Sequence, residues 1–399
     1  MSEYIVKLSD KGTIAVDDTI LVKDAQSAAG SHILEGFKPL FSAEAVTRLE
    51  KAGYEMAGKT NVGEFGLDLV GEFSYYGEKS ADGSEETLKG AAAKAVAEGK
   101  VKAALGVDMN GATRRAAALS GVDFLKPTYG TVSRYGIISC AASGEQLGVY
   151  AGNVEGIKEV MEVIAGHDDK DGTSLREESY SYCTADAVSG KKVCIVKELM
   201  EKADEETAAR VNAYADKLRK AGVTVEEVSV NFFDVANTTW QILMTAETCN
   251  NVSRYDGVKY GHRAAEYKNI DELYVNTRTE GFNFLTKAVI LYGSDVLSKN
   301  RYEDCYGKSL KVRRVIAEKF AKLMESYDAV LTPVCSKSSY TAYDISEAFQ
   351  KVFEESVFTA VANLIGVPAL TSGGVQLMGK AFSESVLLSL AGSAERAGE

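Results

Sequence analysis

The chain has 399 residues, enough for one large domain or two of medium size. Its 45% hydrophobic and 26% charged residues are ordinary for a soluble globular protein, and its 4 prolines argue against a Pro-rich linker or a disordered chain. A formal net charge of −12 without any basic block argues against extended direct contact with nucleic acid.

Strand-like and helix-like patterns alternate along the chain. A short apolar run at 19–22 is followed by a helix predicted from Ser42, with Val46 and Leu49 on one face and Gly53 as its stop. A later helix is predicted after Asn153, and further strands at 191–197, 223–230 and 327–334. This alternation predicts an α/β layered fold with a largely parallel sheet.

No segment divides the chain into separate domains. There is no fixed-period repeat and no linker rich in Ser, Gly or Pro. The least core-like stretch, 167–187, is rich in Asp, Ser and Glu, and we interpret it as a surface excursion rather than a boundary. We therefore expect a single domain over residues 1–399.

The 6 cysteines show no CxxC spacing and no pairing with histidine that would bind a metal. No secretory signal begins the sequence, so we expect reduced thiols, a cytoplasmic location and neither metal nor cofactor. The longest apolar stretch, 357–370, is interrupted by Asn363, Gly366 and Pro368, which argues against a membrane span.

Common catalytic motifs are missing, including the phosphate loop, HExxH, GxSxG and GxGxxG after a strand. Of the 3 histidines, His167 is expected on the surface, and His262 is either a ligand contact or, more commonly, a structural residue. Lys23 follows an apolar run. Considered alone, Lys23 is expected to be an exposed lysine beside Asp24. If it instead lies at a buried strand end, it could lose its proton and act as a base.

Several segments together resemble one known family. They are 17–37 (DDTILVKDAQSAAGSHILEGF), 57–68 (AGKTNVGEFGLD), 121–137 (GVDFLKPTYGTVSRYGI), 250–263, 310–320 and 363–382. The chain resembles the amidase-signature family and, within it, the A subunits of glutamyl-tRNA(Gln) amidotransferases. This resemblance implies an amidase-signature fold: a single layered domain with a large mixed, mainly parallel central sheet flanked by helices on both faces.

The resemblance also implies a catalytic arrangement that this chain has lost in part. Family members hydrolyse amides with a lysine base, a relay serine in a cis peptide and a nucleophilic serine. By similarity Lys23 is the base. The stretch DMNGATR places Ala112, which has no hydroxyl, at the nucleophile, and Leu88 stands at the relay serine.

The segment 81–100 predicts a helix where the family has its relay loop. Asp82 and Glu85 resemble a capping box, the following residues favour helix, and Gly99 is the expected stop. A cis non-proline peptide bond is costly and persists where function requires it. We therefore expect no cis bond between Leu88 and Gly90.

The substrate contacts are also kept only in part. Arg313 corresponds to the arginine that holds the glutamine carboxylate, whereas the acidic partner for the amino group falls on Ser356, beside Glu355. The alternative for Arg313 is a surface ion pair. Two deletions are also expected: a short lead-in before Lys23 and a short loop before Gly374.

Three functions follow as hypotheses. The first is a noncatalytic scaffold or regulatory component, inactive on its own, whose partners are B-like and C-like amidotransferase subunits; in the family the B subunit uses ATP to activate the glutamate on tRNA. The second is a glutamine or amide binder that uses Arg313. The third is an amidase with a rewired nucleophile. Thr113 is next to Ala112, but one residue along a turn its side chain should point elsewhere, and Ser120 and Cys140 have no evident base beside them.

Overall fold

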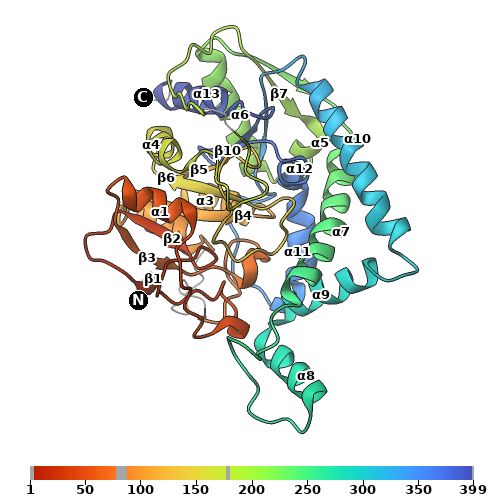
Figure 1. The fold of residues 1–399 in the computed structure, drawn as a ribbon. Coiled ribbons are helices and arrows are strands. Elements are labelled where there is room, and N and C mark those ends of the chain that lie inside the picture. The colour runs from red at the N-terminus through yellow and green to blue at the C-terminus, as the bar shows by residue number, and fades with distance from the viewer. Residues whose placement is uncertain (1–3, 78–87, 177–179, 398–399) are drawn as a thin grey trace.

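The structure is a computed structural model that describes residues 4–77, 88–176 and 180–397. Its centre is one 11-stranded sheet in the order β1-β3-β2-β4-β6-β5-β10-β11-β9-β7-β8 (Figure 1). The strands are β1 Tyr4–Lys7, β2 Ile14–Asp17, β3 Met56–Thr60, β4 Ala103–Asp108, β5 Asp123–Lys126, β6 Gln146–Ala151, β7 Lys192–Val196, β8 Thr224–Val228, β9 Ala329–Pro333, β10 Ala369–Ser372 and β11 Val375–Met378.

The sheet is mixed, as expected, but it is not mainly parallel. Within the described residues, parallel pairs join β2 to β3 and β4, and β7 to β8 and β9, whereas the six other pairs are antiparallel. Parallel neighbours need a crossover connection, whereas a two-residue turn joins antiparallel ones. Gly373 and Gly374, both at positive φ, form such a turn between β10 and β11, and this is the short loop expected from the sequence.

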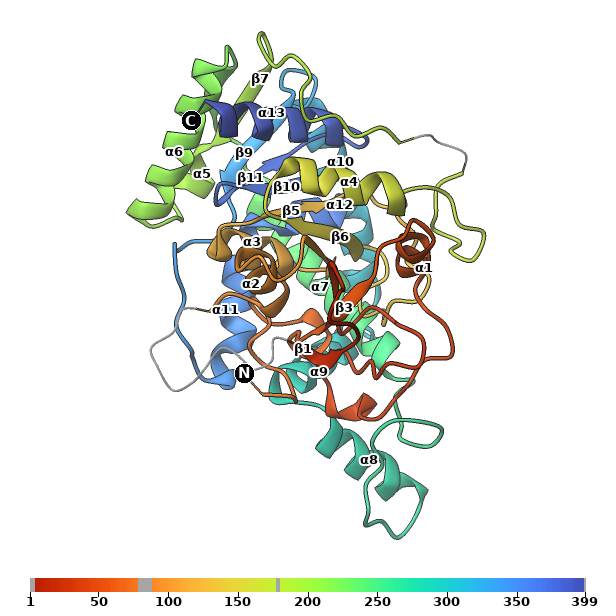
Figure 2. The same cartoon turned by 90° about the vertical axis from the view of Figure 1, so that its left-hand side faces the viewer.

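Helices cover both faces of the sheet, as Figures 1 and 2 show. They are α1 Glu44–Lys51, α2 Ala91–Ala97, α3 Ala112–Ser120, α4 Val154–Ile164, α5 Lys197–Met200, α6 Glu205–Lys220, α7 Phe233–Val252, α8 Ile270–Gly281, α9 Phe284–Val296, α10 Lys308–Leu323, α11 Ala348–Glu355, α12 Ala360–Ile365 and α13 Glu384–Arg396. Buried side chains of β7 alternate between the faces: Val193 and Ile195 pack in one core cluster, Cys194 and Val196 in another.

Local sequence signals explain several of these elements. The side chain of Asn153 caps α4 by accepting from Gly156 N, as predicted. Ser42 does not cap α1; its Oγ accepts a hydrogen bond from the backbone N–H of Lys23 instead. The run 19–22 is not a strand, because β2 ends at Asp17 and the chain turns there, with Ile20 N donating to Asp17 O.

The segment 167–187 contains neither helix nor strand in its described residues, 167–176 and 180–187. Hydrogen bonds nevertheless tie it to the rest of the chain. Buried Asp168 accepts from Ser133 Oγ at 2.7 Å, and Asp171 accepts from Arg134 N at 2.7 Å. These carboxylates fold the segment onto the loop after β5.

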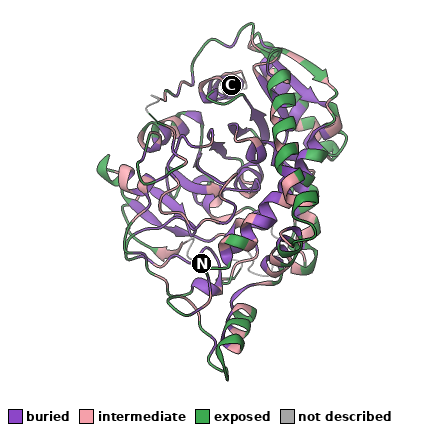
Figure 3. Cartoon of the chain, turned by 45° about the vertical axis from the view of Figure 1, so that its right-hand side comes forward, coloured by how far each residue is buried: buried purple, intermediate pink, exposed green. Residues whose placement is uncertain are grey.

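Burial follows the layers of the fold. Figure 3 shows the strands and α7 largely buried, while α10 exposes much of its outer side. Helix α8 projects at the lower end of the molecule in Figure 1. Across the described residues, no helix is both long enough and apolar enough to cross a lipid bilayer.

Candidate active site

The turn that carries Ala112 is held by a buried ion pair. Arg114 donates to both carboxylate oxygens of Asp108, at 2.9 and 3.0 Å, and neither side chain is exposed to solvent. Arg114 also donates to Gln376 Oε1 at 2.6 Å, and Asn363 Nδ2 donates to Asp108 Oδ1 at 2.8 Å. Burial alone would raise the pKa of Asp108, but Arg114 and its hydrogen bonds hold that pKa well below its usual range.

Ala112 is the first residue of α3, directly after Gly111. It lines a cavity of about 30 Å³ together with Asp17, Asp68, Gly90 and Tyr150, among others. This volume is far below the roughly 300–1,000 Å³ of ligand pockets. Ala112, which the resemblance aligns with the nucleophile, therefore presents a methyl group to a small cavity.

Thr113 also lines this cavity, although its side chain was expected to point elsewhere. Its Oγ1 donates a hydrogen bond of 2.5 Å to Asp108 Oδ2. Because Arg114 depresses the pKa of Asp108, that carboxylate is a weak base and cannot readily take the proton of Thr113. Thr113 is thus a structural hydroxyl.

Leu88, which the resemblance aligns with the relay serine, is buried, and its N–H donates to Tyr340 O at 2.8 Å. The expected absence of a cis bond between Leu88 and Gly90 is confirmed, and the rest of the described chain has none either. The predicted long helix is wrong at residues 88–90: Gly90, at φ +70°, is the N-cap of α2. A Cβ there would lie 2.8 Å from both Val70 O and Ala116 Cβ. The proposed Asp82–Glu85 capping box lies outside the described residues.

Lys23 does not emerge from a buried strand end, so that structural expectation is wrong. It is exposed, six residues after the end of β2. The titratable residue at that strand end is buried Asp17, which accepts from Thr19 N and Val107 N, each at 2.9 Å, and faces the cavity of Ala112. Burial raises the pKa of Asp17, an effect that these hydrogen bonds oppose.

A buried lysine does lie beside β2, but it is Lys59 on β3. Its ammonium donates to Ile20 O at 2.8 Å and to Ser27 Oγ, and lies 3.4 Å from Asp18 Oδ1. Burial lowers the pKa of Lys59, while Asp18 opposes that shift. No local pattern marks Lys59, because the strand Met56–Thr60 (MAGKT) has neither a long apolar run nor an apolar–polar alternation.

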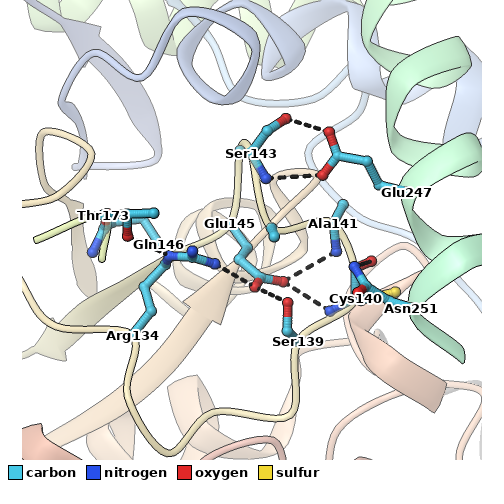
Figure 4. A network of polar contacts seen from close by, with 12 residues as sticks. Arg134, Ser139, Cys140, Ala141, Ser143, Glu145, Gln146, Thr173, Glu247 and Asn251 are labelled. Atoms are coloured by element: carbon cyan, nitrogen blue, oxygen red, sulfur yellow. Dashed lines mark hydrogen bonds and ion pairs between the residues drawn. The ribbon is translucent and has the colours of Figure 1, made fainter. Parts of the chain in front are cut away.

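Arg313 is bound within the protein. It donates to Ser143 Oγ at 3.1 Å and to Ser143 O at 2.9 Å, and burial lowers its pKa. Glu247 on α7 holds the same serine from another side, accepting from its N–H at 2.9 Å and its Oγ at 2.5 Å (Figure 4). The surface ion-pair alternative is therefore not what the structure shows.

The turn that contains Ser143 is fixed by buried Glu145. Figure 4 shows its carboxylate accepting from the N–H groups of Cys140 and Ala141, at 2.9 and 3.1 Å, and from Arg134 at 2.8 Å. Cys140 is itself buried against Thr248, and burial raises the pKa of its thiol. A thiol with a raised pKa is a poor nucleophile at neutral pH.

The side chains of the remaining candidate site residues also form hydrogen bonds within the protein. Ser356 is buried and donates to Val352 O at 2.6 Å. Glu355 accepts from Ser336 N at 2.8 Å, so its carboxylate is occupied within its own neighbourhood. Ser120 donates to Lys89 O at 2.8 Å. The structure thus gives neither Ser356 nor Glu355 the role of an acidic partner to Arg313.

Comparison with known proteins shows which family this chain resembles in sequence. Residues 13–388 match the Amidase family. The A subunit of glutamyl-tRNA(Gln) amidotransferase from Lactobacillus johnsonii is 36% identical over 399 residues, 96% of this chain and 83% of that protein. The protein of the same name from Lachnoclostridium phytofermentans is 35% identical over 407 residues, 96% of this chain and 82% of its own length.

Solved structures agree in fold. The structure of the glutamyl-tRNA(Gln) amidotransferase A subunit from Thermotoga maritima has a TM-score of 0.80 at 28% identity and covers 98% of this chain and 86% of its own. A protein described as an amidase shares the fold with a TM-score of 0.77 at 22% identity, over 96% of this chain and 83% of its own. The chain therefore belongs to the amidase-signature family, with the A subunits of glutamyl-tRNA(Gln) amidotransferases as its relatives over nearly its full length.

Proposed function

We propose that this chain is a noncatalytic counterpart of the amidotransferase A subunits, a scaffold or regulatory component of a tRNA-dependent amidotransferase-type complex. The observation that carries the proposal is the cavity of about 30 Å³ in which Ala112 stands at the nucleophile position and Asp17 at the adjoining strand end. The expected partners are B-like and C-like amidotransferase subunits.

The chemistry supports this proposal. Covalent amide hydrolysis needs a nucleophile, a group that accepts its proton, and space for the tetrahedral intermediate. Here position 112 has no side-chain oxygen, position 88 has no hydroxyl, and the cavity is far smaller than the roughly 300–1,000 Å³ of ligand pockets. The Asp108–Arg114 pair, which supports the turn, is fully formed. Stability of the framework has thus been kept while the reactive groups have been lost.

The first test is ammonia release from glutamine by the full chain, alone and with a matching pair of B and C subunits. We expect no release, and we expect none from Ala112→Ser, because Leu88 cannot relay the proton of the new serine. Ammonia release by the natural chain that disappears in Lys23→Ala would overturn the proposal and indicate a lysine-dependent site. Rescue by Ala112→Ser would show that the site is closer to active than its geometry indicates.

The complex itself needs a separate test, because loss of activity alone does not make a scaffold. Co-purification with the B-like and C-like subunits should give a stable complex in size-exclusion chromatography. Failure of the full chain to associate with any such partner would remove the scaffold proposal while leaving the absence of catalysis intact.

The glutamine-binder hypothesis receives less support. The guanidinium of Arg313 already binds Ser143, and neither Ser356 nor Glu355 is placed to receive an ammonium there. An unpaired buried ammonium is costly. We therefore expect no saturable heat in calorimetry with glutamine up to millimolar concentration, and a saturable signal lost in Arg313→Met would favour the binder instead.

A further inference from the structure

A second pocket, of about 320 Å³, lies where the loop 64–75 meets the connection between α8 and α9. This volume is at the small end of ligand pockets, which span about 300–1,000 Å³. It shares no lining residue with the cavity of Ala112. Its lining residues are His32, Glu64, Glu72, Phe73, Ser74, Tyr75, Glu280, Gly281, Phe282, Asn283 and Ile345.

Aromatic rings form much of the wall. The rings of His32 and Tyr75 are stacked, with centroids 4.3 Å apart and planes 9° from parallel. His262 also packs against His32, with ring centroids 3.9 Å apart, and its Nε2 lies 2.7 Å from Glu280 Oε2. Tyr75 is 46% exposed, so its ring lies at the mouth of the pocket. The stack is therefore preformed and partly open to solvent.

Most titratable side chains in the described lining are acidic, and His32 is the one basic residue among them. Glu64, Glu72 and Glu280 contribute carboxylates, and none of the described lining residues is a lysine or an arginine. In the described part of the chain no lysine or arginine forms an ion pair with Glu64 or Glu72. The pocket thus combines aromatic faces with carboxylates that lack a lysine or arginine partner.

Glu64 is the most buried of these carboxylates, at 3% exposure. It accepts from Ser31 Oγ at 2.5 Å, from Asn283 N at 2.9 Å and from Thr286 Oγ1. Burial raises the pKa of Glu64 to about 7, although these hydrogen bonds and the positive charge of Lys287 oppose the shift. A cation in the pocket would oppose the shift further.

We propose that this pocket binds a small organic cation, a protonated amine or ammonium attached to a short apolar body. Aromatic faces attract cations through their quadrupole, and carboxylates add an ionic and hydrogen-bonding partner. The same walls disfavour anions. The proposal does not depend on the noncatalytic role, since it uses none of the residues around Ala112.

The proposal has a pH signature. A protonated amine keeps its charge up to about pH 10, whereas Glu64 gains its negative charge as the pH rises through about 7. Binding of the cation should therefore strengthen from about pH 6 to about pH 8. Replacing Glu64 by glutamine should remove most of this dependence.

The experiment is titration calorimetry of the full chain with benzylammonium, using benzyl alcohol as the neutral analogue and benzoate as the anionic one. We expect saturable binding of benzylammonium only, several times tighter at about pH 8 than at about pH 6. Equal binding of benzyl alcohol, or no saturable binding of benzylammonium at millimolar concentration, would overturn the proposal.

Two kinds of variant locate the site. Tyr75→Leu, at the exposed mouth, should weaken benzylammonium binding about threefold to tenfold through loss of the aromatic face. Glu64→Gln should flatten the pH profile; if that variant does not fold, Glu280→Gln on the exposed rim should weaken binding instead. Glu318→Gln, an exposed glutamate on α10, is the control and should bind as the natural chain does. Unchanged affinity in Tyr75→Leu and in the glutamate variant would place the bound cation elsewhere and refute the assignment.

Discussion

Arg114→Ala is expected to lower the free energy of unfolding by about 3–5 kcal/mol, because it leaves the carboxylate of Asp108 buried without its partner. Neither side chain of this pair has any solvent exposure. The same substitution also removes the donors to Gln376 Oε1 and Thr359 O. Urea unfolding followed by circular dichroism would measure the change, with the slope checked for two-state behaviour.

The matched control is Arg314→Ala, which removes an arginine from the surface of α10. Arg314 forms an i,i+4 pair with Glu318, and their side chains are 84% and 64% exposed. Such pairs contribute about 0.3–0.5 kcal/mol. Equal losses in Arg114→Ala and Arg314→Ala would contradict the assignment of the buried pair as the support of the turn.

The Asp108–Arg114 ion pair should also make the stability of the protein depend on pH in a defined direction. The folded pKa of Asp108 lies below its unfolded value of about 4, so the pair stabilises the protein above that pH and loses its contribution as the pH falls through the folded pKa. The difference in stability between the natural chain and Arg114→Ala should therefore shrink below about pH 4. A difference that stays constant down to about pH 3 would show that lost packing, rather than charge, dominates.

Gly111→Ala is expected to destabilise the chain by about 2–4 kcal/mol, from left-handed backbone strain and overpacking together. Gly111 has φ +83°, and an added Cβ would lie 2.4 Å from both Cβ and Oγ1 of Thr359. Thr359 cannot readily move, since its Oγ1 donates to Asn110 O and accepts from Arg115. Thermal and urea unfolding would measure the loss.

Gly121→Ala at the other end of α3 is the matched control. Gly121 also has positive φ, +71°, but an added Cβ would meet no atom within 4 Å. Only the backbone strain remains, so we expect about 1–2 kcal/mol. If Gly111→Ala cost no more than Gly121→Ala, the close approach of Thr359 to the turn would not constrain this site.

Much of the architecture was predictable because its signals are local. The strands predicted at 191–197, 223–230 and 327–334 are present as β7, β8 and β9, and the Asn153 cap starts α4. Whether neighbouring strands pair in parallel or antiparallel was harder to predict from the sequence. The antiparallel pairs in the middle of the sheet depend on which strands meet in space, and hydrophobic periodicity carries no information on that.

The candidate site, too, was predictable from the sequence only in part. That position 112 lacks a hydroxyl is a property of the sequence, whereas its place as the first residue of α3 comes from the structure. The segments around Lys23 and 88–90 were misjudged for a physical reason. An apolar run predicts a buried strand whether or not the chain turns before it, and here the chain turns at Asp17, before the run 19–22. Gly90 has a positive φ and is crowded by Val70 and Ala116, so the helix α2 begins only after Gly90.

By itself, the sequence determined the α/β class, the family and that residues 88 and 112 carry no hydroxyl, since these depend on residue identity and short-range pattern. Only the tertiary structure decided that Lys59 is a buried lysine, that Asp17 faces Ala112 and that Arg313 holds Ser143. Each of these contacts joins residues far apart along the chain. Burial, charge and pKa are set by such neighbours, which folding brings together and which no local pattern specifies.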